Sequence, residues 1–276
     1  MDPFQDKTAI VTGGASGIGR AVGLALARRG ARVILADLNT ELLAKTVEAG
    51  GRAALEVRAA TLDVTDSEAI KRLVAETAAE QGRLDFMFNN AGITVSGDAR
   101  DVPAEDWRRV IEVNLLGVIN GVLAAYPVMV GQGWGHIVNT ASLAGLVPMP
   151  GEIAYTASKF GVVGLSQALR IEGADLGVKV SVVCPGLIDT PIIHTSKVVN
   201  MDRAKLMALA PKAMPADQAA RFILKGVEKN WATIPVGFMA WWMWIAHRLS
   251  PGLTAWFWQV QMRRLRNQVR YKNESA

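Results

Sequence analysis

Cysteine is almost absent from this chain, which narrows the chemistry available to it. Cys184 is the only cysteine, so neither an intramolecular disulfide nor a cysteine-based metal cluster can form. The three histidines, His136, His194 and His247, are scattered and lack the spacing of a metal-binding set. Residues 1–7 contain neither a basic segment nor an apolar run, which argues against a secretory signal. These absences predict a cytoplasmic protein in a reducing compartment, with no bound metal.

Charge is also scarce. Half of the 276 residues are apolar and 20% are charged, a composition typical of a globular protein and not of a disordered one. The length favours one large α/β domain over two small ones. The net charge is +5, and much of it comes from tail residues that face only Glu274 there: Arg263, Arg264, Arg266, Arg270 and Lys272. The rest of the chain is nearly neutral, which argues against a nucleic-acid-binding protein.

The first glycine-rich segment has the context of a dinucleotide-binding loop. Residues 7–12 are a short apolar run that predicts a buried strand, and the apolar pattern after the loop indicates a helix that ends at Gly30. Between them lies Thr12-Gly-Gly-Ala-Ser-Gly-Ile-Gly19. Glycines allow a tight turn and a close approach to a pyrophosphate, whose charge the N-terminal end of the helix stabilises. We therefore expect a dinucleotide at this turn.

A second predicted strand, residues 32–37, ends in Asp37. This carboxylate lies 20 residues beyond Gly17, an offset at which it can accept hydrogen bonds from the adenosine ribose hydroxyls and repel a 2′-phosphate. The alternative is that Asp37 caps a helix, because Leu38-Asn39-Thr40 leads into helical residues 41–50. The glycine loop upstream favours ribose binding.

Strands and helices alternate through the rest of the chain up to residue 236. This pattern predicts a single Rossmann-type, doubly wound parallel sheet with helices on both faces and right-handed crossovers. In such sheets ligands bind beyond the carboxyl ends of the strands, where the glycine loop and the polar residues after each strand would meet. We expect strands at residues 53–62, 84–88, 136–140, 179–184 and 232–236, and helices up to residue 81, over 103–129 and over 154–176.

Tyr155-Thr-Ala-Ser-Lys159 places a phenol and an ammonium four residues apart, on one face of a predicted helix. A nearby cation favours the ionised phenol, whose ordinary pKa of ~10 is too high for efficient proton transfer at neutral pH. Taken alone, this pentapeptide is more often a surface lysine beside a half-buried tyrosine. The motifs upstream give it a catalytic meaning.

Together these segments resemble the short-chain dehydrogenase/reductase family over roughly residues 5–236. The motifs occur in order and at family-like spacing, with Ser142 preceding Tyr155 by 13 residues: Thr12-Gly13-x-x-x-Gly17-x-Gly19, Asp63-Val64, Asn89-Asn90-Ala91-Gly92, Asn114, Ser142, Tyr155-x-x-x-Lys159 and Pro185-Gly186. The resemblance implies a Rossmann-type fold and nicotinamide-dependent oxidoreduction at a carbonyl or a secondary alcohol.

By position, the resemblance implies four catalytic residues. Tyr155 would exchange a proton with the substrate oxygen as general acid/base, and Ser142 would hydrogen-bond the same oxygen. Lys159 would lower the pKa of Tyr155 and hold the nicotinamide ribose, while Asn114 would bind a water that connects Lys159 to solvent. The protein would position the substrate and exchange the proton, and the cofactor would exchange the hydride.

The resemblance also implies a cofactor site and a choice of cofactor. A preference for NADP usually shows as a basic residue just before Gly17 or just after the acidic position, and here those positions hold Ser16 and Leu38. With Asp37 intact, NAD is favoured, and alcohol oxidation is more weakly implied as the working direction. The implied cofactor contacts are Gly13, Ser16, Gly17, Ile18, Gly19, Asp37, Leu38, Asp63, Val64, Asn90, Ala91, Gly92, Tyr155, Lys159, Pro185, Gly186, Ile188 and Thr190.

Two segments would line the substrate side. Residues 192–214 lose clear periodicity, carry several methionines and correspond to a mobile flap of the family. Methionine adapts to irregular apolar shapes, which suggests an apolar substrate, although methionine as core filler explains the same pattern. Met149 lies in a second lining loop by analogy, and His194 of the flap could reach the substrate. The implied substrate contacts are Ser142, Met149, Tyr155 and His194.

Residues 237–276 extend beyond the family pattern and follow a predicted catalytic domain of residues 1–236. Six of the eight tryptophans fall between residues 231 and 258, while the uncharged run 231–246 is shorter than the ~20 residues that a bilayer span needs. Two interpretations stay open: an interfacial membrane anchor, or a cover over the substrate pocket or a neighbouring subunit. After Pro251, arginines oppose one apolar helical face: Trp258, Met262, Leu265 and Val269.

The sequence therefore predicts an NAD-dependent dehydrogenase that interconverts a secondary alcohol and a ketone on an apolar, lipid-, steroid- or aromatic-like substrate. We expect a homodimer or homotetramer that packs through the helices containing Asn114 and Tyr155, with peripheral contact to the inner face of a membrane through residues 237–276 as one option. The alternatives are an NADP-dependent carbonyl reductase and a non-catalytic dinucleotide-binding sensor or scaffold. The complete set of Asn114, Ser142, Tyr155 and Lys159 argues against the sensor.

Overall fold

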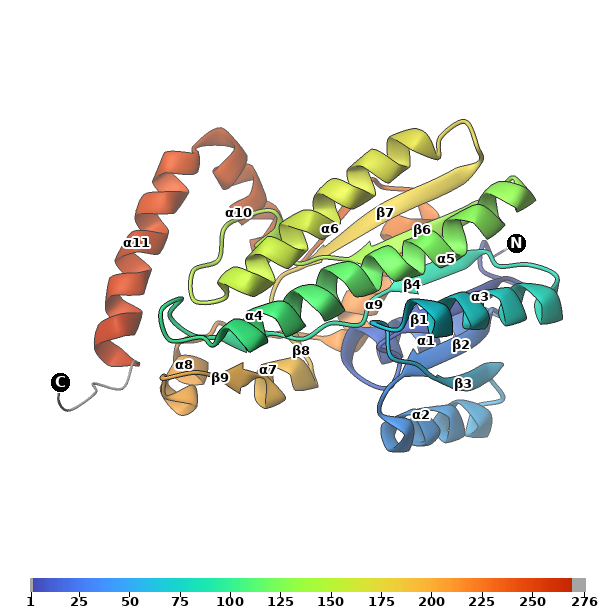
Figure 1. Ribbon diagram of the computed structural model, residues 1–276, viewed down its shortest axis with the longest axis horizontal. Helices are drawn as coiled ribbons and strands as arrows, with labels where there is room; N and C mark the ends of the chain where they lie inside the picture. The colour runs from blue at the N-terminus through green and yellow to red at the C-terminus, as the bar shows by residue number, and fades with distance from the viewer. Residues whose placement is uncertain (1, 270–276) are drawn as a thin grey trace.

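Seven parallel strands form the central sheet of the computed structural model, which describes residues 2–269 (Figure 1). In sheet order they are β11 (Thr233–Val236), β7 (Val178–Pro185), β6 (Gly135–Thr140), β4 (Phe86–Asn89), β1 (Thr8–Thr12), β2 (Arg32–Asp37) and β3 (Val57–Thr61). The direction of winding reverses between β1 and β4, and such a reversal opens a crevice at the carboxyl ends of the strands. The predicted doubly wound parallel sheet is confirmed.

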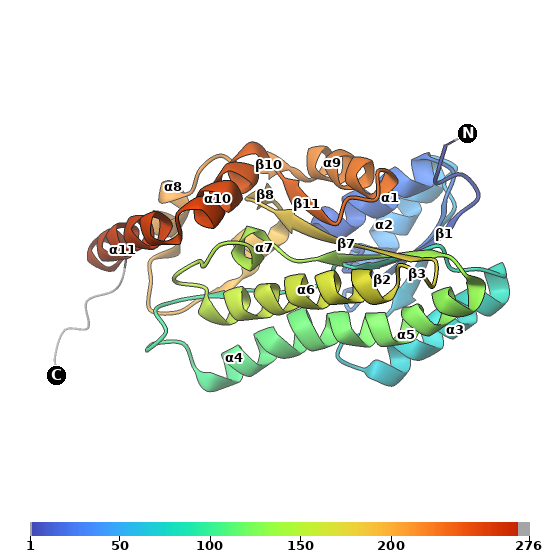
Figure 2. The ribbon, with the colours of Figure 1, turned by 90° about the horizontal axis from the view of Figure 1, so that it is seen from above.

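Helices cover both faces of this sheet (Figure 2). One face carries α1 (Gly17–Arg28), α2 (Thr40–Arg52) and α9 (Ala216–Glu228), and the other carries α3 (Ser67–Gln81), α5 (Gly117–Gln132) and α6 (Ile153–Glu172). Successive strand residues point to opposite faces, so Ile10 packs into one apolar core and Val11 into the other. Burial on both faces explains why the strands read as continuous apolar runs.

The helix expected at residues 103–129 is longer and interrupted. It consists of α4 (Ala104–Ile111), a π-helical turn at Glu112–Leu116 and α5, which continues to residue 132 although Pro127 lies inside it. Among the described residues, this is the one helical stretch long and apolar enough to cross a membrane. Its two parts pack against α6 and α3, and 39% of its most apolar window is buried.

Two other predicted boundaries were wrong. The strand expected at residues 53–62 is shorter, because Ala54 adopts a left-handed conformation with φ 54° after α2 and β3 begins only at Val57. The helix expected to reach residue 176 ends at Glu172, because Gly173 follows as its cap and Gly177, with φ 78°, turns the chain into β7. Apolar periodicity locates an element better than it locates its ends.

The segment between β7 and α9, expected to lack periodicity, contains short elements. They are the helices α7 (Pro191–Thr195) and α8 (Arg203–Leu209) and two small parallel pairs, β8 (Ile188–Asp189) with β10 (Met214–Pro215) and β5 (Val95–Ser96) with β9 (Lys197–Val198). The β5–β9 pair joins this segment to the loop after β4. The segment is therefore tied to the body through β9, while the β8–β10 pair brings its own two ends together.

The C-terminal extension forms two helices, α10 (Phe238–Leu249) and α11 (Pro251–Gln268), which stand apart from the sheet (Figure 1). We call them the C-terminal hairpin. The end of α11 returns to the body, where the Arg266 Nε donates to Asp98 Oδ2 at 2.8 Å and the Asp202 N–H donates to the Val269 carbonyl at 2.9 Å. The predicted apolar face of α11 is confirmed, since Val269 and Met262 are buried. Three tail residues named above lie outside the described residues: Arg270, Lys272 and Glu274.

Candidate active site

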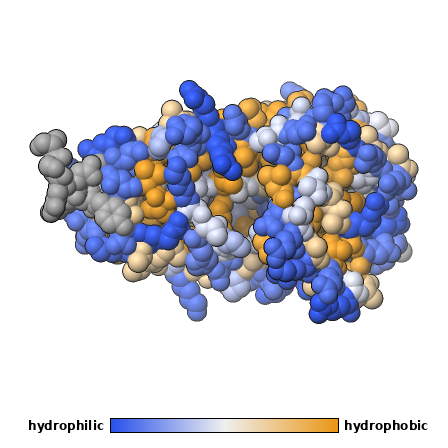
Figure 3. Space-filling model, turned by 60° about the horizontal axis from the view of Figure 1, so that its bottom comes forward, coloured by the Kyte–Doolittle hydropathy of each residue, from blue (hydrophilic) through white to orange (hydrophobic). Residues whose placement is uncertain are grey.

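A cavity of about 1100 Å³ lies at the carboxyl ends of the strands. It extends from the loop between β1 and α1 to the C-terminal hairpin, and Figure 3 shows the molecule hollowed near its middle, with apolar side chains in the hollow. Most of the predicted cofactor residues border it: Gly13, Ser16, Gly17, Ile18, Asp37, Leu38, Asp63, Val64, Asn90, Ala91, Gly92, Tyr155, Pro185, Gly186, Ile188 and Thr190. The structure thus brings together the ends of β1, β2, β3, β4 and β7.

The glycines after β1 are required by the geometry of the loop. Gly13 and Gly17 have φ angles of 66° and 53°, in the region that favours glycine. Gly19 lies behind the cavity wall, where a Cβ atom would come within 2.2 Å of the Gly13 carbonyl oxygen. Ser16 precedes α1 without capping it through its side chain, so the first amide groups of the helix remain open to a ligand. This cradle fits the pyrophosphate of a dinucleotide.

Asp37 supports the same loop from the neighbouring strand. Its Oδ2 accepts a hydrogen bond from the Ala15 N–H at 3.0 Å, and its Oδ1 accepts one from the Asn39 N–H at 2.9 Å. The cap of α2 is Asn39, whose side chain accepts from the Leu42 N–H at 3.0 Å. The helix-cap alternative for Asp37 was therefore wrong, and its carboxylate borders the cavity beside Leu38.

Asn90 fastens the end of β4 to the glycine loop. Its side-chain amide donates to the Thr12 carbonyl at 3.0 Å, and its backbone N–H donates to the Thr12 hydroxyl at 2.9 Å. Two residues further, Gly92 leaves room for the groups behind the wall, because a Cβ atom there would lie 3.2 Å from Asn114 Oδ1 and 3.5 Å from Lys159 Nζ. These contacts hold the glycine loop and the β4 end in one position.

Ser142, Tyr155 and Lys159 meet beside the cavity from two elements. Ser142 begins the 3₁₀ turn Leu143–Gly145 after β6, where its hydroxyl accepts from the Ala144 N–H at 3.1 Å, and it lies beside Tyr155 in the first turn of α6. One helical turn on, Lys159 is buried and donates to the Thr140 carbonyl at 2.8 Å. Its Nζ lies 5.4 Å from the centroid of the Tyr155 ring. The three side chains thus meet, but Lys159 and Gly19, two of the predicted cofactor contacts, do not border the cavity.

Burial governs the pKa values of this group. Burial raises the pKa of Tyr155 above its ordinary value, and the hydrogen bond with Ser142 offsets this only in part. Burial also lowers the pKa of Lys159 to about 8. The expected lowering of the Tyr155 pKa by Lys159 is therefore not achieved by the protein groups alone, because loss of water disfavours the phenolate more than its neighbours favour it.

Asn114 lies in the π-helical turn and is fully buried. Its Oδ1 accepts from the Ile93 N–H and its Nδ2 donates to the Ile93 carbonyl, both at 2.8 Å, and Nδ2 also reaches Ser158 Oγ at 3.3 Å. The side chain therefore holds the loop after β4. Its Oδ1 keeps a second lone pair, so the water relay to Lys159 that the resemblance implies stays a prediction.

The two remaining predicted substrate residues have different positions. Met149 borders the cavity together with Ser142 and Tyr155. His194 does not border it: the side chain is 60% exposed and lies 3.5 Å from Asp189 Oδ1. The short helix α7 instead turns Ile193 toward the cavity, which corrects the expectation for His194.

Sequence reasoning missed the charged groups at the substrate end. Glu152, three residues before Tyr155, borders the cavity and accepts a hydrogen bond from the Ser96 hydroxyl at 3.0 Å. Burial raises its pKa. The spacing from Tyr155 could have revealed it, because residues three apart share a helix face. Three arginines also border the cavity, from α4, α8 and α11, and no local pattern links them: Arg109, Arg203 and Arg264.

The C-terminal hairpin supplies a further part of the wall that the sequence did not assign. Its lining residues are Met239, Met243, Phe257, Trp258, Gln261, Arg264, Leu265 and Gln268. Of the two open interpretations of the extension, a cover over the substrate pocket therefore agrees with one face of the hairpin. The other face is exposed and is considered below.

Cys184 is fully buried in β7, where burial raises the pKa of its thiol to about 12, so it stays protonated. Among residues 2–269, no three His, Cys, Asp or Glu side chains are arranged to hold a metal ion.

Comparison with known proteins identifies the family. Residues 7–198 match the profile of the family described as short chain dehydrogenase. The SadH protein of Mycobacterium tuberculosis is 37% identical over 246 residues, which are 87% of this chain and 89% of that protein. The cyclohexanol dehydrogenase of an Acinetobacter species is 38% identical over 213 residues, 75% of this chain and 81% of that enzyme. The chain therefore belongs to the short-chain dehydrogenases, and the resemblance stated from the sequence is confirmed.

A solved structure extends this likeness to three dimensions. The crystal structure of a Burkholderia phymatum short chain dehydrogenase/reductase in complex with NAD superimposes with a TM-score of 0.82 at 29% identity, over 92% of this chain and 97% of that chain. The protein is thus an oxidoreductase of this family that acts on CH–OH groups with a nicotinamide dinucleotide. The predicted fold and enzyme class are confirmed.

Proposed function

We propose that this protein is an NAD-dependent alcohol dehydrogenase that interconverts a secondary alcohol and a ketone on an apolar, lipid-, steroid- or aromatic-like substrate. The observation that supports it most strongly is the meeting of Ser142, Tyr155 and Lys159 beside a cavity whose other end is the glycine loop. A binding protein without catalysis has no need for a phenol and a serine there, so the sensor is the weaker candidate.

The proposed roles follow from position. In alcohol oxidation, the substrate hydroxyl gives its proton to the Tyr155 oxygen, and the Ser142 hydroxyl holds the substrate oxygen beside the phenol. The Lys159 ammonium, 5.4 Å from the ring, favours the phenolate through its charge. A nicotinamide dinucleotide held by the glycine loop and Asp37 would supply the acceptor for the hydride on the carbinol carbon. In ketone reduction, Tyr155 returns the proton.

The adenosine end of the cavity supports NAD over NADP. Asp37 borders this end, and the two neighbouring positions that could carry a cation hold Ser16 and the exposed Leu38. A 2′-phosphate would meet the carboxylate of Asp37 with no basic group at these positions, which costs affinity because like charges repel. An NADP-dependent carbonyl reductase remains the second candidate.

The walls near the catalytic group support an apolar substrate. Leu143, Met149, Ile192, Met201 and Met243 all border the cavity. Several of them are methionines, which adapt to irregular apolar shapes. The Acinetobacter relative is named for cyclohexanol, an apolar secondary alcohol, and 38% identity makes a similar substrate class reasonable here.

We also propose a homodimer or homotetramer that packs through the α5 and α6 layer. Large apolar side chains are exposed on this layer and the turn before it: Leu116, Leu123, Phe160 and Ile171. Exposed apolar groups on one layer mark an association surface. Light scattering tests this proposal, and a monomer at micromolar concentration would contradict it.

The test of the function is turnover followed at the absorbance of the reduced nicotinamide. The full chain is given NAD⁺ or NADP⁺ with a series of secondary alcohols, from cyclohexanol to longer apolar compounds. Faster oxidation with NAD⁺ than with NADP⁺ supports the proposed cofactor. Faster oxidation of the longer apolar alcohols than of cyclohexanol supports the proposed substrate class. Turnover with NADP⁺ alone would favour the second candidate. Tight cofactor binding with no turnover of any alcohol or ketone would favour the sensor.

A further inference from the structure

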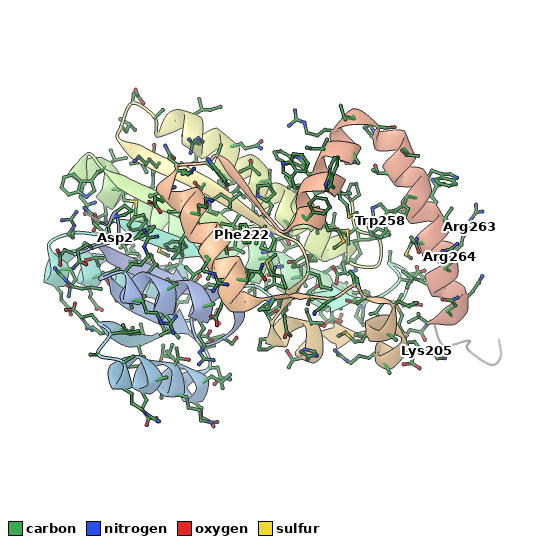
Figure 4. The ribbon with its side chains drawn as sticks, turned by 180° about the vertical axis from the view of Figure 1, so that it is seen from behind. Asp2, Lys205, Phe222, Trp258, Arg263 and Arg264 are labelled. Carbon is green, nitrogen blue, oxygen red and sulfur yellow. The ribbon has the colours of Figure 1, made fainter. Side chains whose placement is uncertain are left out.

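The C-terminal hairpin has two faces with different surroundings. Its inner face borders the catalytic cavity through Met243, Trp258 and Leu265. In Figure 4, Trp258 points toward the body of the molecule, whereas Arg263 projects from the opposite side of α11. The inner face is explained by the cavity, and the outer face is not.

The outer face is apolar and aromatic. On α10, Phe238, Trp242 and Leu249 recur at helical spacing and are 78%, 49% and 82% exposed. On α11, Leu253 and Trp256 are 60% and 61% exposed. The rings of Phe238 and Trp242 contact edge to face with centroids 5.8 Å apart, so these two exposed rings of α10 form one patch. An apolar surface of this kind marks a binding site.

The charge on the hairpin has one sign. Residues 238–268 contain no Asp or Glu, yet they carry one histidine and four arginines. Arg266 forms an ion pair with Asp98. Of the other three, which make no ion pair with a carboxylate among the described residues, Arg264 borders the cavity, whereas Arg248 and Arg263 are exposed and do not border it. The exposed surface of the hairpin is therefore aromatic and cationic at once.

We propose that the outer face of the C-terminal hairpin binds the surface of an anionic lipid bilayer. Tryptophan prefers the boundary between hydrocarbon and water, and arginine can keep its stem in the apolar layer while its guanidinium pairs with an anionic headgroup. A second copy of this chain is a poorer occupant. Two apposed outer faces would bring cations together with no acidic residue on either hairpin to pair with them.

Docking of this kind would also connect the bilayer to the active site. The same two helices carry the lipid-facing residues on one side and the cavity-lining residues on the other, so an apolar alcohol leaving the bilayer has a short route past Trp258 into the cavity. This second part rests on the proposed dehydrogenase function. Membrane binding itself does not.

The first experiment is flotation of the full chain with vesicles of phosphatidylcholine, with and without phosphatidylglycerol. The test variant combines Phe238→Ala, Trp242→Ala and Trp256→Ala, none of which borders the cavity. The matched control is Phe222→Ala, which removes an exposed aromatic ring from α9 on another part of the surface (Figure 4). We expect the wild-type chain and the control to float with the anionic vesicles, and the triple variant to lose at least about tenfold in partition coefficient.

Arg263→Glu should weaken vesicle binding a few-fold at low salt and less at high salt.

Three results would overturn membrane binding. The wild-type chain could stay with the lipid-free fractions, or the triple variant could float as well as the wild type. The triple variant could also change the oligomeric state in light scattering while no form binds vesicles, which would assign the face to a second copy. None of these readouts needs turnover, so failure of the proposed function would be recognised separately.

The second experiment tests delivery of substrate. With turnover established, the triple variant should oxidise soluble cyclohexanol at the wild-type rate and a vesicle-embedded long-chain secondary alcohol several-fold more slowly. Equal rates of the two proteins on the embedded alcohol, or an equal loss on both alcohols, would overturn the delivery.

Discussion

The two ends of the catalytic cavity are built in different ways. At the cofactor end, hydrogen bonds and backbone contacts fix each group, as Asp37, Asn90 and Gly19 show. At the substrate end, the C-terminal hairpin stands apart from the sheet and returns to the body through a few apolar contacts and the Arg266–Asp98 ion pair. Many contacts therefore fix the side chains at the cofactor end, whereas few contacts fix the hairpin at the substrate end.

The proposed function accounts for this difference. A dinucleotide presents hydroxyl and phosphate groups at fixed separations, so its site needs one geometry. An apolar substrate is held by contact area, which methionine and aromatic side chains can supply in several arrangements. We therefore expect changes at the cofactor end and at the catalytic group to abolish function, and changes at the hairpin to modulate it.

The largest effect is expected at the catalytic group. Tyr155→Phe removes the proton-exchanging oxygen and should lower kcat by about 10³-fold or more, with the affinity for NADH nearly unchanged. Steady-state kinetics and tryptophan quenching by NADH measure the two quantities. The control is Tyr126→Phe on α5, which removes a phenol outside the cavity and should leave kcat unchanged. Wild-type turnover by the Tyr155 variant would remove this residue from the mechanism.

The glycine loop at the cofactor end should tolerate no added side-chain atom at Gly19. Gly19→Ala places a Cβ 2.2 Å from the Gly13 carbonyl oxygen, so we expect a loss of about 2 kcal/mol in the free energy of unfolding and at least tenfold weaker NAD binding. Chemical denaturation and calorimetry measure these effects. Gly131→Ala is the matched control: its Cβ would meet nothing within 4 Å, and the change should stabilise α5 by up to about 1 kcal/mol. Equal stability of both variants would show that the loop can yield.

Cofactor choice should depend on Asp37 and its neighbour. The double change Asp37→Ala with Leu38→Arg removes a carboxylate and adds a cation where a 2′-phosphate would lie, so the ratio of kcat/KM for NADP⁺ over NAD⁺ should rise by about 10- to 100-fold. Asp217→Ala, on α9, is the control and should leave the ratio unchanged. An unchanged ratio in the double variant would place the adenosine elsewhere.

The attachment of the hairpin should weaken in acid. Burial alone would raise the pKa of Asp98, but the hydrogen bond and charge of Arg266, together with Arg100, lower it below its ordinary value. A carboxylate with a lowered pKa adds stability above its unfolded pKa, near ~3.9, and loses it as the pH falls through the lowered value. The protection factors of the α11 amides, which compare measured exchange with intrinsic exchange at the same pH, should therefore fall below about pH 4. Arg266→Gln should abolish most of this pH dependence and raise KM for apolar alcohols a few-fold. Unaltered exchange in that variant would show that apolar contacts alone hold the hairpin.

The smallest effect is expected at Glu152. Its negative charge is one of the causes that raise the pKa of Tyr155, after burial. Glu152→Gln keeps the shape and the contact with Ser96 but removes the charge. The pKa of Tyr155 should therefore fall, and the rise of kcat/KM for alcohol oxidation should move to lower pH by less than about one unit. Glu172→Gln, at the far end of α6, should cause no shift. A move to higher pH would contradict the assigned electrostatics.

The sequence predicted best what depends on neighbours along the chain. The β1 strand, the glycine loop and α1 are contiguous, so their apolar pattern and glycines identified both the fold and the cofactor end. Tyr155 and Lys159 are one helical turn apart and were found for the same reason. The π-helical turn around Asn114 was missed, because no residue type marks an extra residue in a helical turn.

Contacts between distant segments were not predictable in this way. Arg203 and Arg264 border one cavity from α8 and α11, which are about 60 residues apart in the sequence and meet only in the folded chain. His194 was assigned to the substrate side from its place in the flap, yet one position along α7 decides whether a side chain is exposed or borders the cavity. Periodicity cannot decide this in a helix of five residues.

The sequence by itself thus predicted the doubly wound sheet and the dinucleotide loop from short-range spacing and residue chemistry, and the family resemblance implied Ser142, Tyr155 and Lys159 as the proposed catalytic group. Only the tertiary structure decided that burial, and not Lys159, dominates the pKa of Tyr155, and that the C-terminal hairpin has one face on the cavity and one exposed. Loss of water around a group and the choice between two helix faces depend on everything packed nearby, which no local pattern contains.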